Sequence, residues 1–215
     1  MSLPHFFLRE QVLAFESAPV FALHLDADDT KHAKVLRLAV GEHIAVVDAV
    51  SDYFECEIVS FEGDELSVSI AQKLSSYARP EVVLVQGLAK GEKMDTIVRH
   101  ATEVGIAEFV PMTTSRSVVK LDAKKSKARF ERWASIAKSA AMQSGRSSKP
   151  VVHAPCSVAG AVDIAKDCDA VLICWEEAEL SSTLAEAVSC CIAATGKDPR
   201  SLRIALVVGP EGGLT

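Results

Sequence analysis

The stretch LRIALVVGPEGG, residues 202–213, joins an apolar strand directly to a glycine-rich loop. The apolar run Leu202–Val208 predicts a central, buried strand of a sheet. Ligands of open α/β sheets bind at the carboxyl ends of strands, and glycines there allow the backbone to approach a ligand closely. The loop Gly209–Gly213 therefore either contributes to a ligand site or forms a plain tight turn. The chain contains neither GxxxxGK(S/T) nor GxGxxG, the glycine patterns that bind phosphates.

Upstream of this strand, the chain alternates between strands and helices from Pro80 onward. Apolar runs predict the strands, and apolar residues spaced three to four apart predict the helices. The expected strands lie at 82–88, 109–112 and 170–175, and the expected helices lie at 92–104, 125–144 and 180–194. This alternation is typical of an α/β fold with a mostly parallel sheet and helices on both faces.

The first 74 residues follow a different pattern. Short apolar or alternating runs at 43–48, 53–60 and 66–71 predict strands that are separated by turn residues. Short strands at this spacing favour a small β-barrel. The segment SSYARP, residues 75–80, is the predicted linker, so we expect two domains, at 1–74 and 80–215.

The composition of the 215 residues is typical of a soluble globular protein. No apolar run is long enough to cross a bilayer, and the first ten residues are too short and polar for a secretory signal, which predicts a cytoplasmic protein. The six cysteines form no CxxC pair. They are interpreted as reduced, buried thiols, and no metal is expected.

Charge is distributed unevenly along the chain. The net charge is −6, yet Lys90–Lys149 carries 13 Lys or Arg against 6 Asp or Glu, a local charge of +7. The rest of the chain carries −13. This asymmetry is compatible with one RNA-facing surface on an acidic protein, or with a solvated helical face.

Three polar segments follow predicted elements: KGEKMD at 90–95, SRS at 115–117 and QSGR at 143–146. Each has a structural explanation, because acids favour a helix N-terminus and Gly145 is a plausible helix C-cap. Taken together, they place Lys, Arg and Gln side chains at one edge of one sheet, where a ligand site is expected.

These segments also carry a family resemblance. In order, KGEKMD, ATEVGI (101–106), SRSVVK (115–120), ERWASIAKSAAMQSGR (131–146) and GPEGG resemble the motifs of the 16S ribosomal RNA (uracil-N3) methyltransferases. HAKVLRLAVGE, residues 32–42, resembles their leading PUA-like barrel. The resemblance implies a SPOUT-type α/β domain with a C-terminal trefoil knot, an exception to the usual absence of knots. It also implies S-adenosylmethionine as methyl donor, N3 of a uridine in 16S ribosomal RNA as acceptor, and a homodimer.

The resemblance further suggests roles for individual residues. Arg116 and Arg146 are expected to act in catalysis by holding RNA phosphate or the uracil oxygens. The other expected RNA contacts are Lys93, His32, Lys34 and Arg37, although His32 packing within the barrel is an equal alternative. The expected cofactor residues are Glu176, Gly209, Pro210, Glu211, Gly212 and Gly213. Glu211 is a tempting proton acceptor, but it could instead balance the sulfonium charge, so the acceptor is not assigned.

Two alternative functions remain open from the sequence. One is a non-catalytic RNA-binding assembly factor, and the other is a SPOUT methyltransferase that acts on tRNA or on a ribose 2′-oxygen. Relatives continue beyond GPEGG with a segment resembling LGxRILRxETA that completes the knot. This chain ends at Thr215, so the second half of the knot is expected to be missing and cofactor binding to be weakened.

Overall fold

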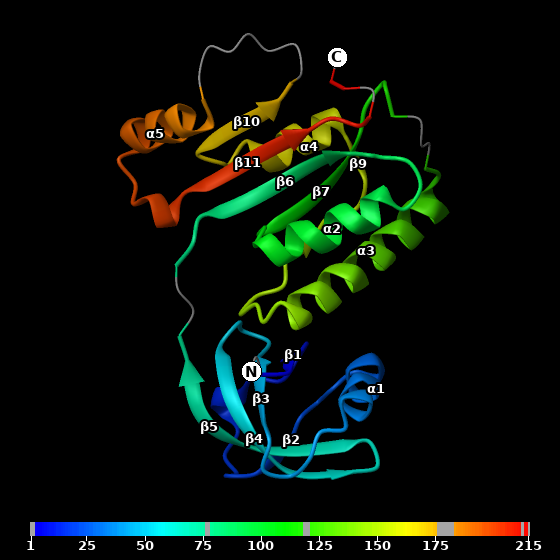
Figure 1. Cartoon of the computed structure of the whole chain (residues 1–215), viewed down its shortest axis with the longest axis vertical. Coiled ribbons are helices and arrows are strands. Elements are labelled where there is room, and N and C mark those ends of the chain that lie inside the picture. Colours follow the sequence, from blue (N-terminus) through cyan, green and yellow to red (C-terminus); the bar gives the residue numbers. More distant parts are fainter. Residues whose placement is uncertain (1–2, 76–77, 118–120, 176–182, 212, 215) are drawn as a thin grey trace. The chain divides into compact units, whose positions relative to one another are not determined.

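The structure is a computed structural model that describes residues 3–75, 78–117, 121–175, 183–211 and 213–214. The chain forms two compact units (Figure 1). The first unit comprises Met1–Tyr77 and Ala141–Lys149, and the second comprises Ala78–Ala140 and Pro150–Thr215.

A five-stranded sheet forms the centre of the first unit, in the order β1-β3-β4-β5-β2. The strands are β1 (His5–Phe7), β2 (Phe21–Ala22), β3 (His43–Val47), β4 (Tyr53–Glu62) and β5 (Glu65–Leu74). Strands β3, β4 and β5 form an antiparallel meander, β1 pairs with β3 in parallel, and β2 pairs with β5. The three strands predicted in this part of the chain are therefore confirmed.

Alternating burial explains how this sheet packs. Phe54, Cys56 and Ile58 of β4 are buried, because alternate side chains of a strand point to the same face. Leu66 and Val68 of the neighbouring β5 join them in one hydrophobic cluster. A 3-10 helix, η1 (Leu13–Phe15), and a helix, α1 (Ala27–Leu36), complete this part of the chain.

A parallel sheet forms the centre of the second unit. Its path is β10-β11-β6-β7-β8, and β9 also pairs with β7. The strands are β6 (Glu81–Gly87), β7 (Glu108–Thr113), β8 (Val151–Val152), β9 (Cys156–Ser157), β10 (Ala170–Cys174) and β11 (Arg203–Val208). All of the pairings are parallel. The predicted parallel sheet is therefore confirmed.

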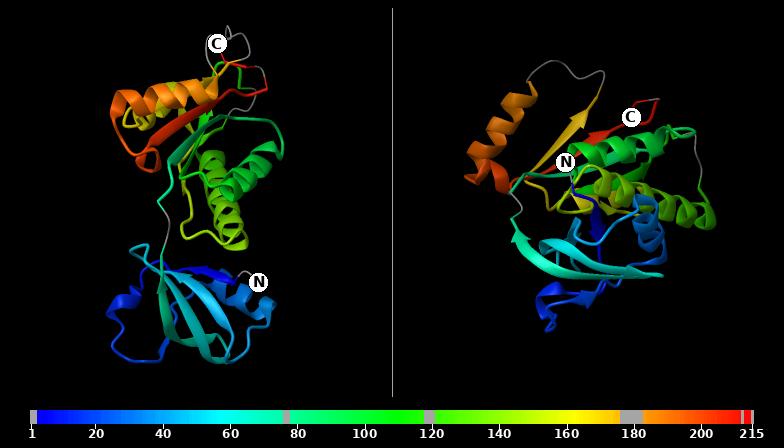
Figure 2. Two further views of the ribbon diagram at one scale, coloured as in Figure 1. Left: turned by 60° about the vertical axis from the view of Figure 1, so that its left-hand side comes forward. Right: turned by 60° about the horizontal axis from the view of Figure 1, so that its bottom comes forward.

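Helices cover both faces of this sheet, as Figure 2 shows. On one face, Leu84 of β6 packs in a cluster with α2 (Lys93–Val104) and α3 (Ala123–Gln143). The neighbouring Val83 and Val85 lie in a second cluster with α4 (Val158–Ala165). The last helix, α5 (Leu184–Thr195), lies beside β10. Two predicted helices are confirmed at α2 and α3, while α5 begins later than the predicted residue 180.

The prediction that Leu202–Val208 is buried is only partly correct. Strand β11 lies between β10 and β6, but of its own residues only Ala205 is buried, and the others are half-buried. On the neighbouring β10, Val171 and Ile173 are exposed. One face of these strands borders an open cavity, and apolar side chains that face a cavity are not covered by a neighbouring layer.

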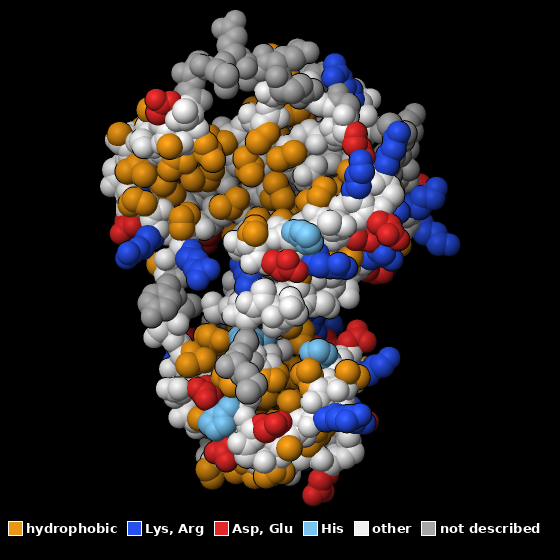
Figure 3. Space-filling view, viewed as in Figure 1, with side chains coloured by type: hydrophobic (Ala, Val, Ile, Leu, Met, Phe, Trp, Pro, Cys, Tyr) orange, Lys and Arg blue, Asp and Glu red, His pale blue; other side chains and the backbone are white. Residues whose placement is uncertain are grey.

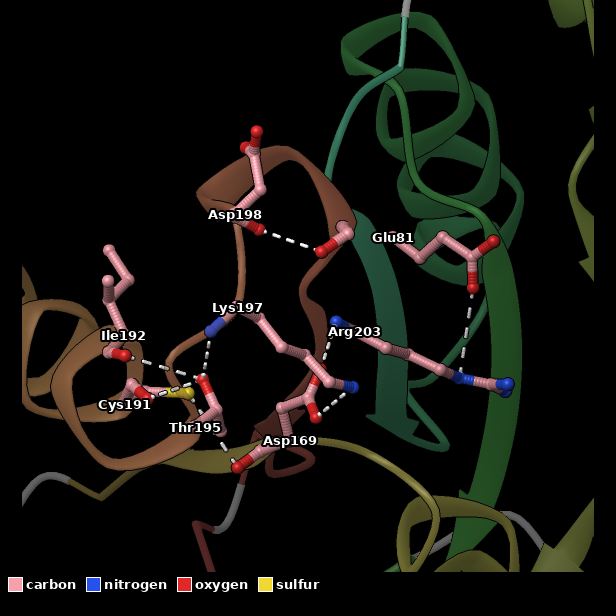
Figure 4. A network of polar contacts seen from close by, with 9 residues as sticks. Glu81, Asp169, Cys191, Ile192, Thr195, Lys197, Asp198 and Arg203 are labelled. Carbon is pink, nitrogen blue, oxygen red and sulfur yellow. Dashed lines mark hydrogen bonds and ion pairs between the residues drawn. The ribbon is translucent and has the colours of Figure 1, made fainter.

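Ion pairs tie the strands together at the amino edge of this sheet (Figure 4). Asp169, which precedes β10, accepts hydrogen bonds from the Lys197 ammonium at 2.7 Å and from the backbone N–H of Arg203 at 2.9 Å. The Lys197 ammonium lowers the pKa of Asp169. The Arg203 guanidinium pairs with Glu108 and lies 4.0 Å from Glu81. These contacts join the starts of four neighbouring strands, at the edge opposite their carboxyl ends.

The cysteines are free thiols, but the prediction that they are buried holds only in part. Cys56 and Cys191 are buried, whereas Cys174 and Cys190 are exposed. Burial raises the pKa of Cys56 to about 12, so this thiol stays protonated at neutral pH.

Candidate functional site

The carboxyl ends of β6, β7, β10 and β11 meet at one edge of the second unit, because these strands are parallel neighbours. Three loops leave this edge: the β6–α2 loop at 88–92, the β7–α3 loop, described at 114–117 and 121–122, and the loop after β11, described at 209–211 and 213–214. The geometry therefore brings the sequence motifs KGEKMD, SRS and GPEGG to the same edge. QSGR, which was also expected there, follows the end of α3 and lies in the segment Ala141–Lys149 of the first unit.

The loop after β11 packs closely against the end of β6. The Gln86 side-chain amide donates a hydrogen bond to the Gly209 carbonyl at 3.2 Å. Pro210 is buried, and a Cβ atom added at Gly87 would lie 2.4 Å from its nitrogen. A tight turn follows, in which the Gly213 N–H donates to the Pro210 carbonyl at 2.8 Å. Gly213 has a φ of 74°, a conformation that favours glycine.

Glu211 connects the loop after β11 to the β6–α2 loop. One carboxylate oxygen, Oε1, accepts hydrogen bonds from the Lys90 backbone N–H at 3.1 Å and from the Lys93 ammonium at 3.0 Å. Hydrogen bonds from the Lys93 ammonium, first of all, and from the backbone N–H groups of Lys90 and Glu211 lower the pKa of Glu211 to about 2. A carboxylate with such a low pKa is a poor proton acceptor at neutral pH. Glu211 is therefore better explained as a link between two loops than as a general base.

The loop after β7 presents its polar residues in an ordered turn. The buried Ser117 hydroxyl accepts a hydrogen bond from the Thr114 N–H at 2.9 Å and lies 3.2 Å from the Thr114 hydroxyl. This local bonding pattern is typical of turns stabilised by serine. As a result, Ser115 and Arg116 are exposed at the carboxyl edge.

A cavity of about 540 Å³ lies between the sheet and α4 and reaches this edge. Its sheet wall includes Val85 and Val207, and its lining is largely apolar. At the carboxyl edge the lining residues are Thr114, Ser115, Trp175 and Leu214, which follow three different strands. Small-molecule sites have volumes of roughly 300–1,000 Å³ and combine apolar walls with a few polar groups, so this cavity suits such a ligand.

The second unit brings together some of the site residues predicted from the sequence. Lys93 and Arg116 are exposed at the carboxyl edge, with Lys93 paired to Glu211. Arg146 belongs to the first unit through the segment 141–149, so it is not one of the groups that the second unit gathers at this edge. Glu176 and Gly212 lie outside the described residues.

The remaining predicted RNA contacts lie in the first unit, and all three are exposed. His32 and Lys34 belong to α1, and Arg37 ends this helix with a φ of 55°. Lys34 pairs with Asp64. The His32 ring lies 6.1 Å from the Phe6 ring, a contact that fits the packing alternative for this histidine.

Sequence reasoning missed several residues of the edge, among them Gln86, Gly87, Thr114 and Trp175. One signal was available, since Gly87 follows an apolar run and glycine at a strand end often marks a close backbone approach. Trp175 was assigned to the end of a strand without a role in the site.

The rest of the described structure adds two negative findings. Across the described ranges, no helix combines the length and apolar character needed to cross a membrane. Within the same ranges, no three His, Cys, Asp or Glu side chains are grouped so that they could hold a metal ion.

Comparison with known proteins places the chain in a family. A family model described as an RNA methyltransferase domain matches residues 77–215. The ribosomal RNA small subunit methyltransferase E of Bacillus subtilis (strain 168) is 34% identical over 203 residues, which cover 93% of this chain and 77% of that protein.

Two solved structures share the fold. One, described as a methyltransferase of Legionella pneumophila and solved in complex with the bound cofactor SAM, is 25% identical, with a TM-score of 0.78. The match covers 100% of this chain and 83% of the Legionella chain. The other, a ribosomal RNA small subunit methyltransferase E from Neisseria gonorrhoeae, is 23% identical, with a TM-score of 0.76 over 99% of this chain and 82% of that one. The chain therefore belongs to the RNA methyltransferase family that includes the ribosomal RNA small subunit methyltransferases E.

Proposed function

We propose that this chain transfers a methyl group from S-adenosylmethionine to N3 of a uridine in 16S ribosomal RNA. The observation that carries the proposal is the carboxyl edge of the second unit. There a glycine-rich loop is fixed against β6 beside a cavity of about 540 Å³. The 34% identity to a ribosomal RNA small subunit methyltransferase supports the substrate, and the SAM complex of the Legionella protein supports the cofactor.

The residues at this edge fit such a cofactor. Backbone atoms of Gly209, Pro210 and Gly213 are proposed to line its binding site, with the apolar cavity accepting the less polar parts of the molecule. The Thr114 and Ser115 hydroxyls supply hydrogen-bonding groups at the same cavity. Bound cofactor supplies an already activated methyl group on a sulfonium. The protein must therefore position N3 in line with that group and help the N3 proton leave.

Arg116 is proposed to hold RNA at this edge. Methylation converts the uracil N3–H into N3–CH₃, and loss of the proton leaves negative charge on the uracil oxygens as the reaction proceeds. A guanidinium that donates hydrogen bonds to these oxygens or to a phosphate stabilises that charge. Since N3 pairs in a Watson–Crick helix, the target base must be unpaired or extruded. Glu211 stays a proposed cofactor residue and Lys93 a proposed RNA contact. Glu176 and Gly212, which lie outside the described part of the chain, also stay proposed cofactor residues.

The first unit is proposed to be a PUA-like barrel that positions the RNA through His32, Lys34 and Arg37, and Arg146 stays a proposed catalytic and RNA-binding residue together with Arg116. The second unit is proposed to be a SPOUT domain, of the kind that has a C-terminal trefoil knot, in a homodimer, with the domains divided near residues 75–80. Sedimentation of the purified chain tests the dimer, and a monomer at all concentrations would contradict it.

Mass mapping of modified nucleotides in 16S ribosomal RNA tests the function. In RNA from cells lacking this gene, one monomethylated uridine should disappear, and the purified chain with S-adenosylmethionine should restore it. N3 methylation removes the Watson–Crick donor, so it should stop reverse transcription at that nucleotide, whereas ribose 2′-O-methylation leaves the pairing edge intact. An unchanged modification pattern would contradict the function and favour a non-catalytic RNA-binding protein.

An Arg116→Ala variant should lose roughly 10- to 100-fold of its methyl transfer, because a hydrogen bond to a charged group contributes about 1.5–3 kcal/mol. Its melting temperature should stay close to that of the wild-type chain, since the side chain is exposed. Arg99→Ala, at an exposed arginine on α2, is the matched control and should keep its activity. Parallel losses of melting temperature and activity in R116A would assign Arg116 a structural role.

A further inference from the structure

The first turns of α3 carry more positive charge than helix stability explains. Lys124, Lys125 and Lys127 are exposed there, and the first turn contains no acidic residue. The N-terminus of a helix is the positive end of its dipole, so cations at this end are unfavourable. Asp122 accepts a hydrogen bond from the Lys125 N–H at 2.8 Å, which accounts for Asp122 as a cap but leaves the lysines unexplained.

Neighbouring acids do not remove this charge. The Lys125 ammonium lies 3.2 Å from Asp122, and the Lys127 ammonium lies 3.9 Å from Glu131. All four side chains are more than half exposed. Exposed ion pairs are weak and easily exchanged for other partners. Between Asp122 and Glu131 the chain has four basic residues against two acidic ones, so the helix start stays positive.

The helix start lies next to the carboxyl edge of the sheet. Helix α3 follows the loop after β7, and so it begins at the edge where β7 ends. A small cavity of about 20 Å³ has Leu121 and Arg129 on one side and Ala89 and Gly91 of the β6–α2 loop on the other. The two segments therefore pack together, and the β6–α2 loop adds Lys90 to the same region. Figure 3 shows Lys and Arg side chains gathered over the α2 and α3 side of the second unit, and mostly hydrophobic ones over β10 and α5.

We propose that the start of α3, through Lys124, Lys125 and Lys127, binds the phosphate backbone of RNA that flanks the target nucleotide. The inference rests on the proposed function. Lysine ammonium groups are suited to phosphate, and the positive end of a helix dipole favours an anion nearby. Phosphate contacts fix the position of RNA without reading its sequence. This surface therefore contributes affinity and register, while the loops of the carboxyl edge act on the base.

A double variant that removes two positive charges, Lys124→Gln with Lys127→Gln, tests this surface. Its binding to a 16S ribosomal RNA fragment is measured by fluorescence anisotropy over a series of salt concentrations. The slope of log affinity against log salt should fall by about one for each lysine removed. Arg79→Gln with Arg200→Gln removes the same charge from exposed positions that precede β6 and β11 near the amino edge, and it should leave the slope unchanged. The melting temperature of the α3 variant should not fall, because the lysines oppose the helix dipole.

Three results would overturn the inference. The first is a salt slope in the α3 variant that equals that of the wild-type chain. The second is an equal decrease of the slope in both double variants. The third is a wild-type chain that binds phosphatidylserine vesicles but not RNA. Methyl transfer by the wild-type chain is measured in parallel. If the wild-type chain is active and the slope of the α3 variant is unchanged, only the α3 inference is contradicted. If the wild-type chain is inactive but its RNA binding depends on these lysines, only the proposed function is contradicted.

Discussion

A Gly87→Ala variant should bind S-adenosylmethionine roughly 100-fold more weakly than the wild-type chain. The added Cβ would lie 2.4 Å from the Pro210 nitrogen, 2.5 Å from its Cδ atom and 2.8 Å from the Gly209 carbonyl carbon. Two of these are backbone atoms, so no side-chain rotation relieves the overlap and the loop after β11 must shift. Overpacking of this kind costs about 1–3 kcal/mol, which corresponds to a 5- to 150-fold change in affinity. Calorimetry on both proteins gives the two dissociation constants.

A Gly105→Ala variant is the control that distinguishes a local effect on the cofactor site from a general loss of stability. Gly105 ends α2 with a φ of 113°, so alanine is strained there, but an added Cβ would meet no atom within 4 Å. This variant should lose stability by about 1 kcal/mol, and its cofactor affinity should be unchanged. If G87A and G105A bind the cofactor equally well, the loop after β11 does not form the cofactor site.

A Trp133→Ala variant should lose about 3–5 kcal/mol of unfolding free energy, the usual range for removing a large buried aromatic side chain. Trp133 is 2% exposed. Its ring packs edge-on against Phe109 with 6.3 Å between the centroids, and its Nε1 donates to Asp95 at 3.1 Å. Because Asp95 of α2 also accepts a hydrogen bond from Arg132 of α3, removing Trp133 also weakens the packing of α2 against α3. Urea unfolding measures the change, and Trp133→Phe should recover most of it.

The second tryptophan of the chain provides the matched control. Trp175 is 47% exposed and lines the cavity at the carboxyl edge. Trp175→Ala should therefore change the unfolding free energy by no more than about 1 kcal/mol, and its main effect should be on cofactor affinity. Equal losses of stability in W133A and W175A would contradict the distinction between a core and a cavity tryptophan.

The elements that the sequence predicted share a clear apolar pattern. The buried stripe of α3 includes Trp133, Ala137 and Ala140, which recur at helical spacing. Helix α1 has no such stripe, because Ala33 is its only buried apolar residue, and it was missed. The two- and three-residue strands β1 and β2 are too short to show any period. They form because longer strands offer them pairing partners, a contribution that a local pattern does not contain.

The sequence predicted where the loops of the site lie, but not the contacts between them. The position of GPEGG after an apolar strand placed it correctly at the carboxyl edge. The pairing of Glu211 with Lys93 joins residues 118 positions apart, and the local sequence, which suggests ligand roles for both, does not indicate this contact. The close approach of Gly87 to Pro210 is equally non-local. Such contacts depend on which strands are neighbours, and β6 and β11 are neighbours through a strand order that the local sequence does not specify.

That strand order also determines when the site can form during folding. Strands β6 and β10 each pair with β11 and not with one another. Gln86 and Gly209, which meet at the site, are separated by 123 positions. Contacts at such separations form slowly, and until β11 has inserted, β6 and β10 leave unpaired edges that can associate with other chains. On the ribosome, this sheet stays incomplete until residue 208 has emerged, so the nascent chain is most prone to aggregate just before the loop after β11 takes shape.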